Sequence, residues 1–204
     1  MIGIVDYGLG NVRAFENIYR RLGIDARPVK TSMELVEADR LILPGVGAFD
    51  WAMSSLQQSG MLEGLNQRVL DERVPVLGVC VGMQMMADGS AEGVAKGLGW
   101  ISGQVRRLDE AALNQRTHLP HMGWNDVQPK PNVPLFSGLE APEFYFLHSY
   151  FFDVQGDEDS IATSCYGQVF ACSIRRGNIW ATQFHPEKSH DCGIRLLKNF
   201  AELC

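Results

Sequence analysis

The first half of the chain alternates short β-branched or aliphatic runs with longer segments of helical period. A helix is predicted over about 11–22, and apolar residues spaced through 51–69 predict two more. Thr31 and Glu34 form a capping box that starts another short helix. The strand-like runs cover residues 2–5, 26–29, 40–43 and 74–77. Such alternation predicts a doubly wound, mostly parallel central sheet flanked by helices, with its ligand site at the carboxyl ends of the strands.

The second half has a different pattern. From about Leu98 it becomes rich in strands, with a hairpin predicted at 175–178 and a closing helix on which Ile194, Leu197 and Phe200 face the core. Prolines between 125 and 142 predict a long loop. The fold class is therefore α/β with an additional antiparallel, strand-rich region in the C-terminal half, and residues 1–204 are expected to form a single domain.

The most informative local sequence is Gly78-Val79-Cys80-Val81-Gly82, which directly follows an apolar run. A strand, a tight turn between glycines and a helix start are typical of a nucleophile elbow, with sulfur in place of the usual hydroxyl. We expect the turn to point the Cys80 side chain into solvent above a helix N-terminus, whose dipole favours the thiolate. Taken alone, the pattern also fits a buried structural cysteine.

A second candidate, His185-Pro186-Glu187, lies at the end of another predicted strand. Residues two apart in an extended segment project to the same face, and Pro186 keeps His185 extended. Glu187 is therefore expected to hold one imidazole nitrogen while the other faces the Cys80 thiol, which gives a nucleophile, a base and an orienting acid. The competing interpretation is a hydrogen-bonded structural histidine at a strand end.

These two motifs, over 78–84 and 185–189, resemble those of the class I, triad-type glutamine amidotransferases. Further segments narrow the resemblance to the glutaminase subunits of imidazole glycerol phosphate synthases, namely Asp6–Asn11, Pro44–Phe49, Pro120–Asn125 and Tyr145–Tyr150. The resemblance spans Ile2 to Leu203, although Val79 and Val81 stand where that family usually has isoleucine and leucine. It implies that glutamine is hydrolysed to glutamate and ammonia through a cysteine thioester, with no cofactor.

The same resemblance implies a role for each remaining site residue. The catalytic residues are Cys80, His185 and Glu187. The oxyanion is expected to bind the backbone N–H groups of Val46 and Val81, and Gly45 is expected to let the peptide before Val46 rotate, so that this oxyanion site is switchable. Glutamine is expected to contact the side chain of Gln84 and backbone groups of Gly47, Ser149 and Tyr150.

A partner subunit is also implied. The glutaminase fold is expected to use all 204 residues, with none left for an acceptor domain or an ATP-binding loop. By resemblance the partner is a (β/α)₈-barrel cyclase, which forms a heterodimer with the chain and uses the ammonia to make imidazole glycerol phosphate in histidine biosynthesis. The expected interface residues are Asn11, Trp124, Tyr145 and Lys188, although Trp124 also fits a core position.

Composition narrows the remaining classes. The net charge of −6 and scattered basic residues argue against nucleic-acid binding, and no run is long and apolar enough to predict a membrane span. Met1–Asp6 lacks the basic start of an export signal, and the five cysteines show no paired spacing, so a reducing cytoplasm is expected. Gly8-Leu9-Gly10 lacks the third glycine of a dinucleotide-binding motif, so no such site is expected there. His185, His190 and Cys192 have no fourth candidate ligand at a suitable spacing, so no metal site is expected.

Three alternatives stay open at this point. In the first alternative, the chain is a paralogous glutaminase that supplies ammonia for amidine formation on a surface-polysaccharide sugar. Val81 and Ser189–Cys192 are the candidate markers of this alternative. In the second alternative, it is a cysteine hydrolase or peptidase of the same superfold; the expected interface residues Asn11 and Trp124 argue against this. Or it is an inactive binding protein, which an intact set of nucleophile, base and acid disfavours.

Overall fold

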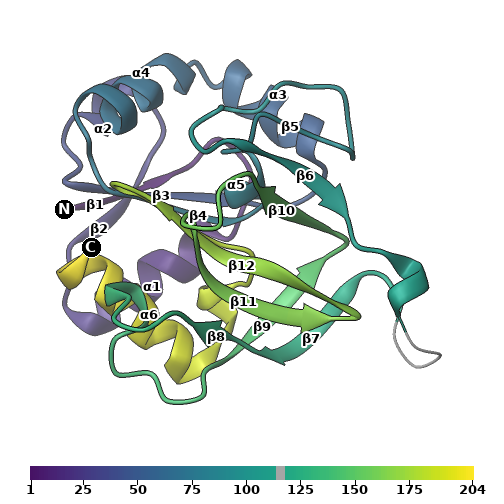
Figure 1. Ribbon diagram of the computed structural model, residues 1–204. Coiled ribbons are helices and arrows are strands. Elements are labelled where there is room, and N and C mark those ends of the chain that lie inside the picture. Colours follow the sequence, from purple (N-terminus) through teal and green to yellow (C-terminus); the bar gives the residue numbers. More distant parts are fainter. Residues whose placement is uncertain (114–117) are drawn as a thin grey trace.

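The largest element of the protein is a central β-sheet. The structure is a computed structural model that describes residues 1–113 and 118–204. Within them the sheet has 8 strands in the order β2-β1-β3-β4-β13-β12-β11-β8 (Figure 1). The strands that pair in parallel are β2 (Ala26–Val29), β1 (Ile2–Val5), β3 (Arg40–Gly45), β4 (Val76–Cys80) and β13 (Ile179–Thr182). The mostly parallel sheet predicted from the alternating pattern is confirmed.

Antiparallel strands extend this sheet on the β13 side. They are β12 (Gln168–Arg176), β11 (Ser160–Tyr166) and β8 (Gln128–Pro129). The predicted hairpin joins β12 to β13, with Arg176 opposite Ile179. The prediction of a loop at 125–142 is wrong in part, because the segment forms the edge strand β8 and the 3-10 turn η3 (Pro134–Phe136). Leu135 and Phe136 of this turn are buried, and the side chain of Asn199 hydrogen-bonds the carbonyl of Leu135.

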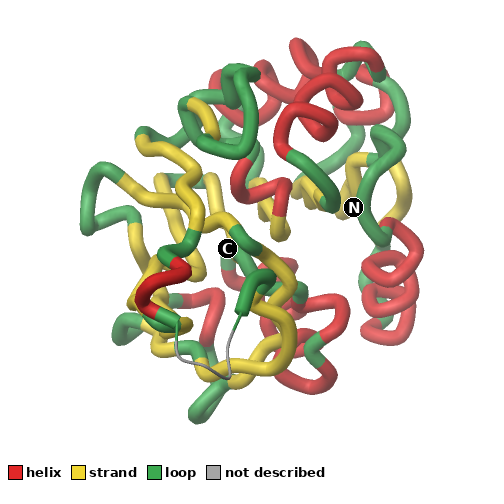
Figure 2. Tube along the Cα trace, turned by 90° about the vertical axis from the view of Figure 1, so that its right-hand side faces the viewer, coloured by secondary structure: helices red, strands yellow, loops and turns green. Residues whose placement is uncertain are grey.

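Helices cover both faces of the central sheet. Figure 1 shows α1 and α6 on one face and α2, α3 and α4 on the other, and Figure 2 shows the same two groups from the side. Their bounds are α1 (Val12–Leu22), α2 (Ser32–Leu35), α3 (Phe49–Gln58), α4 (Leu62–Asn66), followed by the π-helical turn η1 (Gln67–Asp71), and α6 (His190–Leu203). Thr31 caps α2 by accepting the N–H of Glu34, as predicted. Asn11 likewise caps α1 by accepting the N–H of Ala14.

Two smaller sheets lie beside the central one. The first has the order β10-β6-β5, and the second is an antiparallel ribbon of β7 and β9. Their bounds are β5 (Gly89–Ser90), β6 (Gly103–Arg107), β7 (His121–Asp126), β9 (Glu143–His148) and β10 (Tyr150–Val154). Along β7, residues alternate between the buried side and solvent, so that His121 is buried whereas Met122 and Trp124 are exposed.

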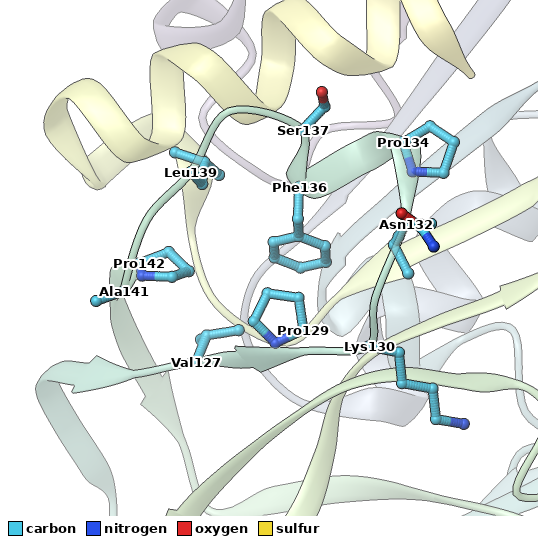
Figure 3. Close-up of a pocket in the computed structure, with 11 residues that line it drawn as sticks. Val127, Pro129, Lys130, Asn132, Pro134, Phe136, Ser137, Leu139, Ala141 and Pro142 are labelled. Atoms are coloured by element: carbon cyan, nitrogen blue, oxygen red, sulfur yellow. The ribbon is translucent and has the colours of Figure 1, made fainter.

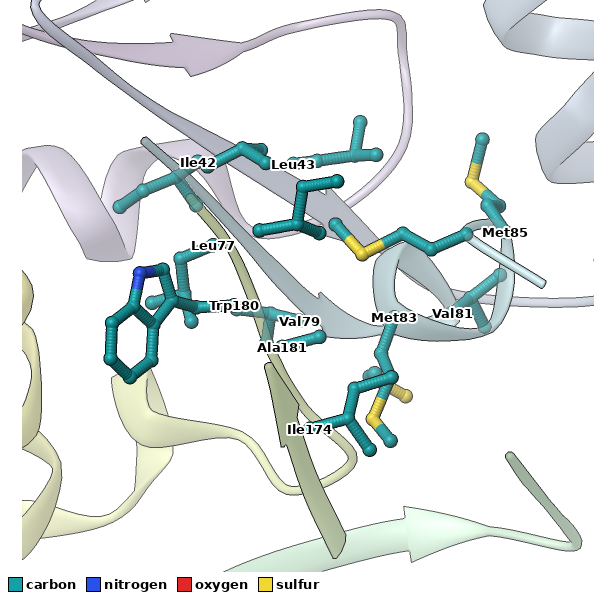
Figure 4. Close-up of a cluster of buried hydrophobic side chains, with 14 of the residues drawn as sticks. Ile42, Leu43, Leu77, Val79, Val81, Met83, Met85, Ile174, Trp180 and Ala181 are labelled. Atoms are coloured by element: carbon teal, nitrogen blue, oxygen red, sulfur yellow. The ribbon is translucent and has the colours of Figure 1, made fainter. Parts of the chain in front are cut away.

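The core is centred on β3, β4 and β13. Every residue of β4 and β13 is buried, which explains their continuous apolar sequences, since helices cover both faces of a parallel sheet. Figure 4 shows part of this cluster, with labelled side chains Ile42, Leu43, Leu77, Val79, Val81, Met83, Met85, Ile174, Trp180 and Ala181. In the ranges 1–113 and 118–204, no helix has the length and apolarity to cross a membrane.

Candidate active site

The elbow around Cys80 is held by close contacts between main chains. Cys80 ends β4 and starts the short helix α5 (Val81–Gln84), with φ 55 and ψ −113, a conformation that residues with a side chain rarely adopt. A Cβ on Gly82 would lie 1.9 Å from the carbonyl oxygen of Leu43, and a Cβ on Gly45 would lie 2.4 Å from the nitrogen of Gly82. These glycines are therefore needed because β3 and the elbow touch directly.

Cys80 itself is only 4% exposed, so the expectation that its side chain points into solvent is wrong. The close approach of β3 and the cover provided by β9 explain this, since the Cys80 Sγ also lies 3.9 Å from the carbonyl oxygen of Leu147. The sulfur instead faces a pocket of about 280 Å³, which His185 also lines. The site lies at the carboxyl ends of β3, β4 and β13, as predicted from the fold class.

The structure brings Cys80, His185 and Glu187 together. Nδ1 of His185 lies 2.9 Å from Oε1 of Glu187, and the imidazole lines the same pocket as Cys80. Burial disfavours the charged imidazole, but the hydrogen bonds and negative charges of Cys80 and Glu187 outweigh this effect and raise the pKa of His185 to about 10. A proton transferred from the Cys80 thiol is therefore held firmly on His185.

The backbone of His185 is fixed to strand β9. Its N–H donates to the carbonyl of Tyr145 at 2.9 Å, and its own carbonyl accepts from the Ser189 hydroxyl at 2.6 Å. The same hydroxyl oxygen accepts the N–H of Tyr145 at 3.0 Å. Ser189 is 1% exposed, so these bonds are shielded from water. His185 is thus held from both sides, by its own turn and by the neighbouring ribbon.

The predicted substrate and oxyanion residues mostly meet at the same pocket. Its walls include Val46, Gly47, Val81, Gln84, Ser149 and Tyr150. Gly45 does not line it and instead packs beneath Val81 and Gly82. Close packing accounts for a glycine there, whereas the predicted rotation of the following peptide stays a prediction.

The amide of Gln84 has a defined direction. Its Nε2 donates to the carbonyl of Tyr150 at 3.0 Å and to Oε1 of Gln183 at 3.0 Å. Both amide hydrogens are then used, so Gln84 offers its oxygen to a ligand. Gln183, which the sequence analysis did not single out, also donates to the Cys80 sulfur at 3.8 Å. One signal was present: Gln183 is an amide inside an apolar run, two residues before His185 and so on the same strand face.

Glu92 is a second residue that the sequence analysis missed. It is the only carboxylate among the described residues that line the pocket. One of its oxygens accepts the N–H of Phe49 at 2.9 Å, at the start of α3, where a negative charge is favoured. No local motif marks Glu92, because its partner lies in another element. The lining of the pocket therefore includes a carboxylate and an amide oxygen, two groups suited to bind an ammonium group.

Three of the predicted interface residues, Trp124, Tyr145 and Lys188, form a cluster, and Asn11 lies on the neighbouring helix α1. Trp124 lies opposite Tyr145 in the β7–β9 ribbon, with ring centroids 6.3 Å apart, and Nζ of Lys188 lies 5.7 Å from the Tyr145 ring. Trp124 is 47% exposed, so it is not a core residue. Asn11 is exposed at the start of α1, and α1 contacts the turn η4 (Pro186–Lys188) that carries Lys188.

A larger hollow of about 610 Å³ lies elsewhere, along the segment 127–142. Figure 3 shows it enclosed by Val127, Pro129, Phe136 and Pro142, with Lys130 at its rim. Lys130 is the only ionisable residue among the described ones that line it. This cavity has no cysteine, histidine or carboxylate among the described residues that line it, whereas the pocket at Cys80 combines a thiol, an imidazole and a carboxylate, so the latter is the candidate active site.

Comparison with known proteins agrees with this geometry. The family model of the class-I glutamine amidotransferases matches residues 3–203, and the chain therefore belongs to that family of glutamine-hydrolysing enzymes. It is similar to the imidazole glycerol phosphate synthase subunit HisH of Bdellovibrio bacteriovorus, at 53% identity over 204 residues, and to the same subunit of Leptospira interrogans, at 47%. Both matches cover 100% of either chain.

A solved structure described as a glutamine amidotransferase has a TM-score of 0.75, with 98% of each chain covered, and at 22% identity it shows the shared fold. The resemblance noted in the sequence, the predicted fold class and the predicted glutaminase function are confirmed by these matches. They do not favour the sugar-amidine, peptidase or inactive alternatives.

Proposed function

We propose that the chain is the glutaminase subunit of an imidazole glycerol phosphate synthase, with Cys80 as nucleophile, His185 as acid and base, and Glu187 as the orienting acid. The observation that carries the proposal is that Cys80 and His185 line a single pocket while Glu187 lies within hydrogen-bond distance of Nδ1 of His185. Full-length relatives that are synthase subunits support the pathway.

The first half of the reaction forms a thioester. His185 takes the proton of Cys80, and the sulfur attacks the side-chain amide carbon of glutamine. The carbon–nitrogen bond breaks as His185 returns the proton to the leaving nitrogen, which departs as ammonia. Glu187 accepts a hydrogen bond from Nδ1–H of His185, keeps the imidazole in its working tautomer and stabilises the imidazolium.

The second half consumes water. His185 removes a proton from water, the hydroxide attacks the thioester carbon, and glutamate leaves as the carbon–sulfur bond breaks. In both halves the negative oxygen of the tetrahedral intermediate is expected to bind the N–H groups of Val46 and Val81. Val81 supports this role because it is the first residue of α5, where N–H groups have no partner within the helix.

The far end of the pocket is proposed to hold the amino acid part of glutamine. The Gln84 oxygen and the Glu92 carboxylate suit its ammonium group. Backbone groups of Gly47, Ser149 and Tyr150 remain the proposed contacts for the rest of the amino-acid end of glutamine. This arrangement directs the side-chain amide of glutamine toward Cys80.

The ammonia is proposed to pass to a (β/α)₈-barrel cyclase that binds the chain as a heterodimer. The cluster of exposed Trp124 and Lys188 with half-buried Tyr145 supports this, because large aromatic side chains dominate many interfaces, and Asn11 is proposed to join them. We also propose that the pair works in the cytoplasm, where a reducing environment keeps the Cys80 thiol reduced.

Glutamate release from glutamine tests the proposal. The purified chain should hydrolyse glutamine when its cognate cyclase subunit is present, and Cys80→Ser should lower kcat at least about 10³-fold, as loss of a catalytic nucleophile does. Activity retained in Cys80→Ser would refute the nucleophile. An active chain that gains nothing from the cyclase, and does not bind it, would refute the partner alone.

A further inference from the structure

Two histidines that the proposed chemistry does not use are buried together beside the pocket. His121 on β7 and His148 at the end of β9 are 3% and 6% exposed and lie opposite each other in the ribbon. Nδ1 of His121 lies 2.9 Å from Nε2 of His148. Buried polar groups are costly unless they are hydrogen-bonded, so a paired arrangement of two imidazoles requires a defined set of partners.

The partners fix the direction of every hydrogen bond. Nδ1 of His148 lies 2.8 Å from the carbonyl oxygen of Tyr150, which only accepts, so this nitrogen donates. At the other end Nδ2 of Asn125 lies 3.1 Å from Nε2 of His121 and donates to it, so the hydrogen of the His121 ring is on Nδ1. Nδ1 of His121 therefore donates to Nε2 of His148, which accepts. Both imidazoles are therefore neutral, each with its proton on Nδ1.

The surroundings keep both rings neutral. Burial lowers the pKa of His121 to about 4, and burial together with the neighbouring His121 lowers the pKa of His148 to about 3. At neutral pH the order of donors and acceptors does not reverse. A proton on either ring would replace an acceptor nitrogen with a second donor and break one bond of the series.

The series ends on a group of the substrate pocket. The carbonyl of Tyr150, which accepts from His148, also accepts from Nε2 of Gln84 at 3.0 Å. Two donors thus hold one carbonyl, and that carbonyl in turn orients the amide of Gln84. We infer that His121 and His148 are positioning residues, which hold the Tyr150 carbonyl and the Gln84 amide in the orientation that binds glutamine. The inference rests on the proposed glutaminase function.

Packing alone does not explain these histidines. The His121 ring is stacked on Phe146 and Tyr166, with centroids 4.7 and 4.0 Å away, and the pair lies among further aromatic rings. A phenylalanine would suit such a stack without burying nitrogen atoms. His121→Phe is therefore a variant that keeps the aromatic shape and removes the hydrogen bonds.

Steady-state kinetics with the cyclase present separates positioning from structure. We expect His121→Phe and His148→Gln to raise KM for glutamine about tenfold, the size of one lost hydrogen bond, and to change kcat less than about threefold. His148→Asn is the matched variant, because its amide nitrogen lies near the position of Nδ1 and can donate to Tyr150. It should restore KM to within about twofold of the wild-type value.

Nitrogen-15 NMR of the imidazoles tests the hydrogen-bond directions without any activity. In the wild-type chain both rings should carry hydrogen on Nδ1 and none on Nε2 near neutral pH. In His121→Phe the Nε2 of His148 should shift, because it loses its donor. A proton on Nε2 of either ring in the wild type would overturn the inference, whether or not the variants fold.

The two experiments separate this inference from the proposed function. A wild-type chain that releases no glutamate with its cyclase would refute the function, and the NMR result would still report on the series. An active wild type whose His121→Phe variant keeps the wild-type KM would overturn the positioning role. Equal loss in His148→Gln and His148→Asn would also overturn it, since a donor at the Nδ1 position would then have no effect.

Discussion

Two regions of the molecule hold the same pocket by different physical means. The region of β3, β4 and α5 fixes Cys80 by contacts between main chains, so tight that a single Cβ on Gly82 would overlap Leu43. The region of β7, β9 and η4 fixes His185, Tyr150 and Gln84 by directed hydrogen bonds among buried polar groups. The first depends on shape and is insensitive to pH, whereas the second depends on donors and protonation.

The largest expected effect breaks the region held by shape. Gly82→Ala forces its Cβ against the carbonyl of Leu43, 1.9 Å away, and backbone on both sides prevents an easy shift. We expect the free energy of unfolding to fall by more than about 2 kcal/mol and kcat to fall more than about a hundredfold, since Cys80 is displaced. Urea unfolding and glutamate release measure the two effects.

Gly89→Ala is the matched control. A Cβ there would meet the end of the flexible Gln104 side chain, at 3.3 Å, rather than backbone. Its stability and kcat should stay close to the wild-type values. A Gly82→Ala variant that behaves like this control would show that the elbow is not fixed by close contact.

The next effect concerns only the region held by hydrogen bonds. Because the pKa values of His121 and His148 in the folded chain are about 4 and about 3, the unfolded chain binds more protons than the folded one below the ordinary value near 6.5. Stability should therefore fall as pH falls from about 6.5 toward 4. From pH 7 to pH 5 the loss is about 2 kcal/mol for each histidine.

Urea unfolding at the two pH values measures this loss, and His121→Phe should lose about half as much as the wild type. His185 acts in the opposite direction, and mainly at higher pH. Its pKa is raised to about 10, so its contribution to stability is complete below about 6.5 and is lost as pH rises through 10. Equal losses in the wild type and His121→Phe would contradict a pair that is kept neutral.

The same contrast explains what the sequence revealed. The elbow, the parallel strands and the His185–Glu187 spacing are local patterns, and each was predicted. The exposure of Cys80 was predicted wrongly, because the approach of β3 to the elbow joins segments far apart in the chain.

The polar contacts escaped prediction for a related reason. Gln84 hydrogen-bonds Gln183, and His121 hydrogen-bonds His148, across long sequence separations. The sequence of a strand does not indicate which residue will bind a polar side chain on it. The position of Glu92 at the pocket likewise depends on its hydrogen bond from Phe49 at the start of α3, which the local sequence does not indicate. The turn at the elbow was encoded locally, whereas its contact with β3 and the hydrogen-bond series both depended on the tertiary fold.

A smaller effect is expected where the ribbon meets its proposed partner. Trp124 is half exposed and contacts Tyr145 and His190. Trp124→Ala should raise the dissociation constant for the cyclase about 30-fold, which is about 2 kcal/mol, and leave glutamate release by the isolated chain unchanged. Isothermal titration calorimetry with the cyclase measures the change.

Leu203→Ala is a suitable control for this experiment. Leu203 is 52% exposed and lies at the end of α6, beside Cys204, whose carbonyl accepts from Arg40 at the start of β3. This is the opposite end of the strands from the pocket. Its binding constant should not change. Equal weakening by both variants would place the partner elsewhere on the surface.

The smallest expected effect tests whether the ribbon positions the base itself. Ser189→Ala removes the hydroxyl that joins the carbonyl of His185 to the N–H of Tyr145. We expect kcat to fall about fivefold to tenfold with KM nearly unchanged, because His185 acts in the transition state and the loss is about one hydrogen bond. Ser164→Ala is the matched control: its buried hydroxyl donates to the carbonyl of Asp126, away from His185. Both variants should lose similar stability, so a kcat loss confined to Ser189→Ala would separate positioning of the base from general destabilisation, and an equal loss in both would reject it.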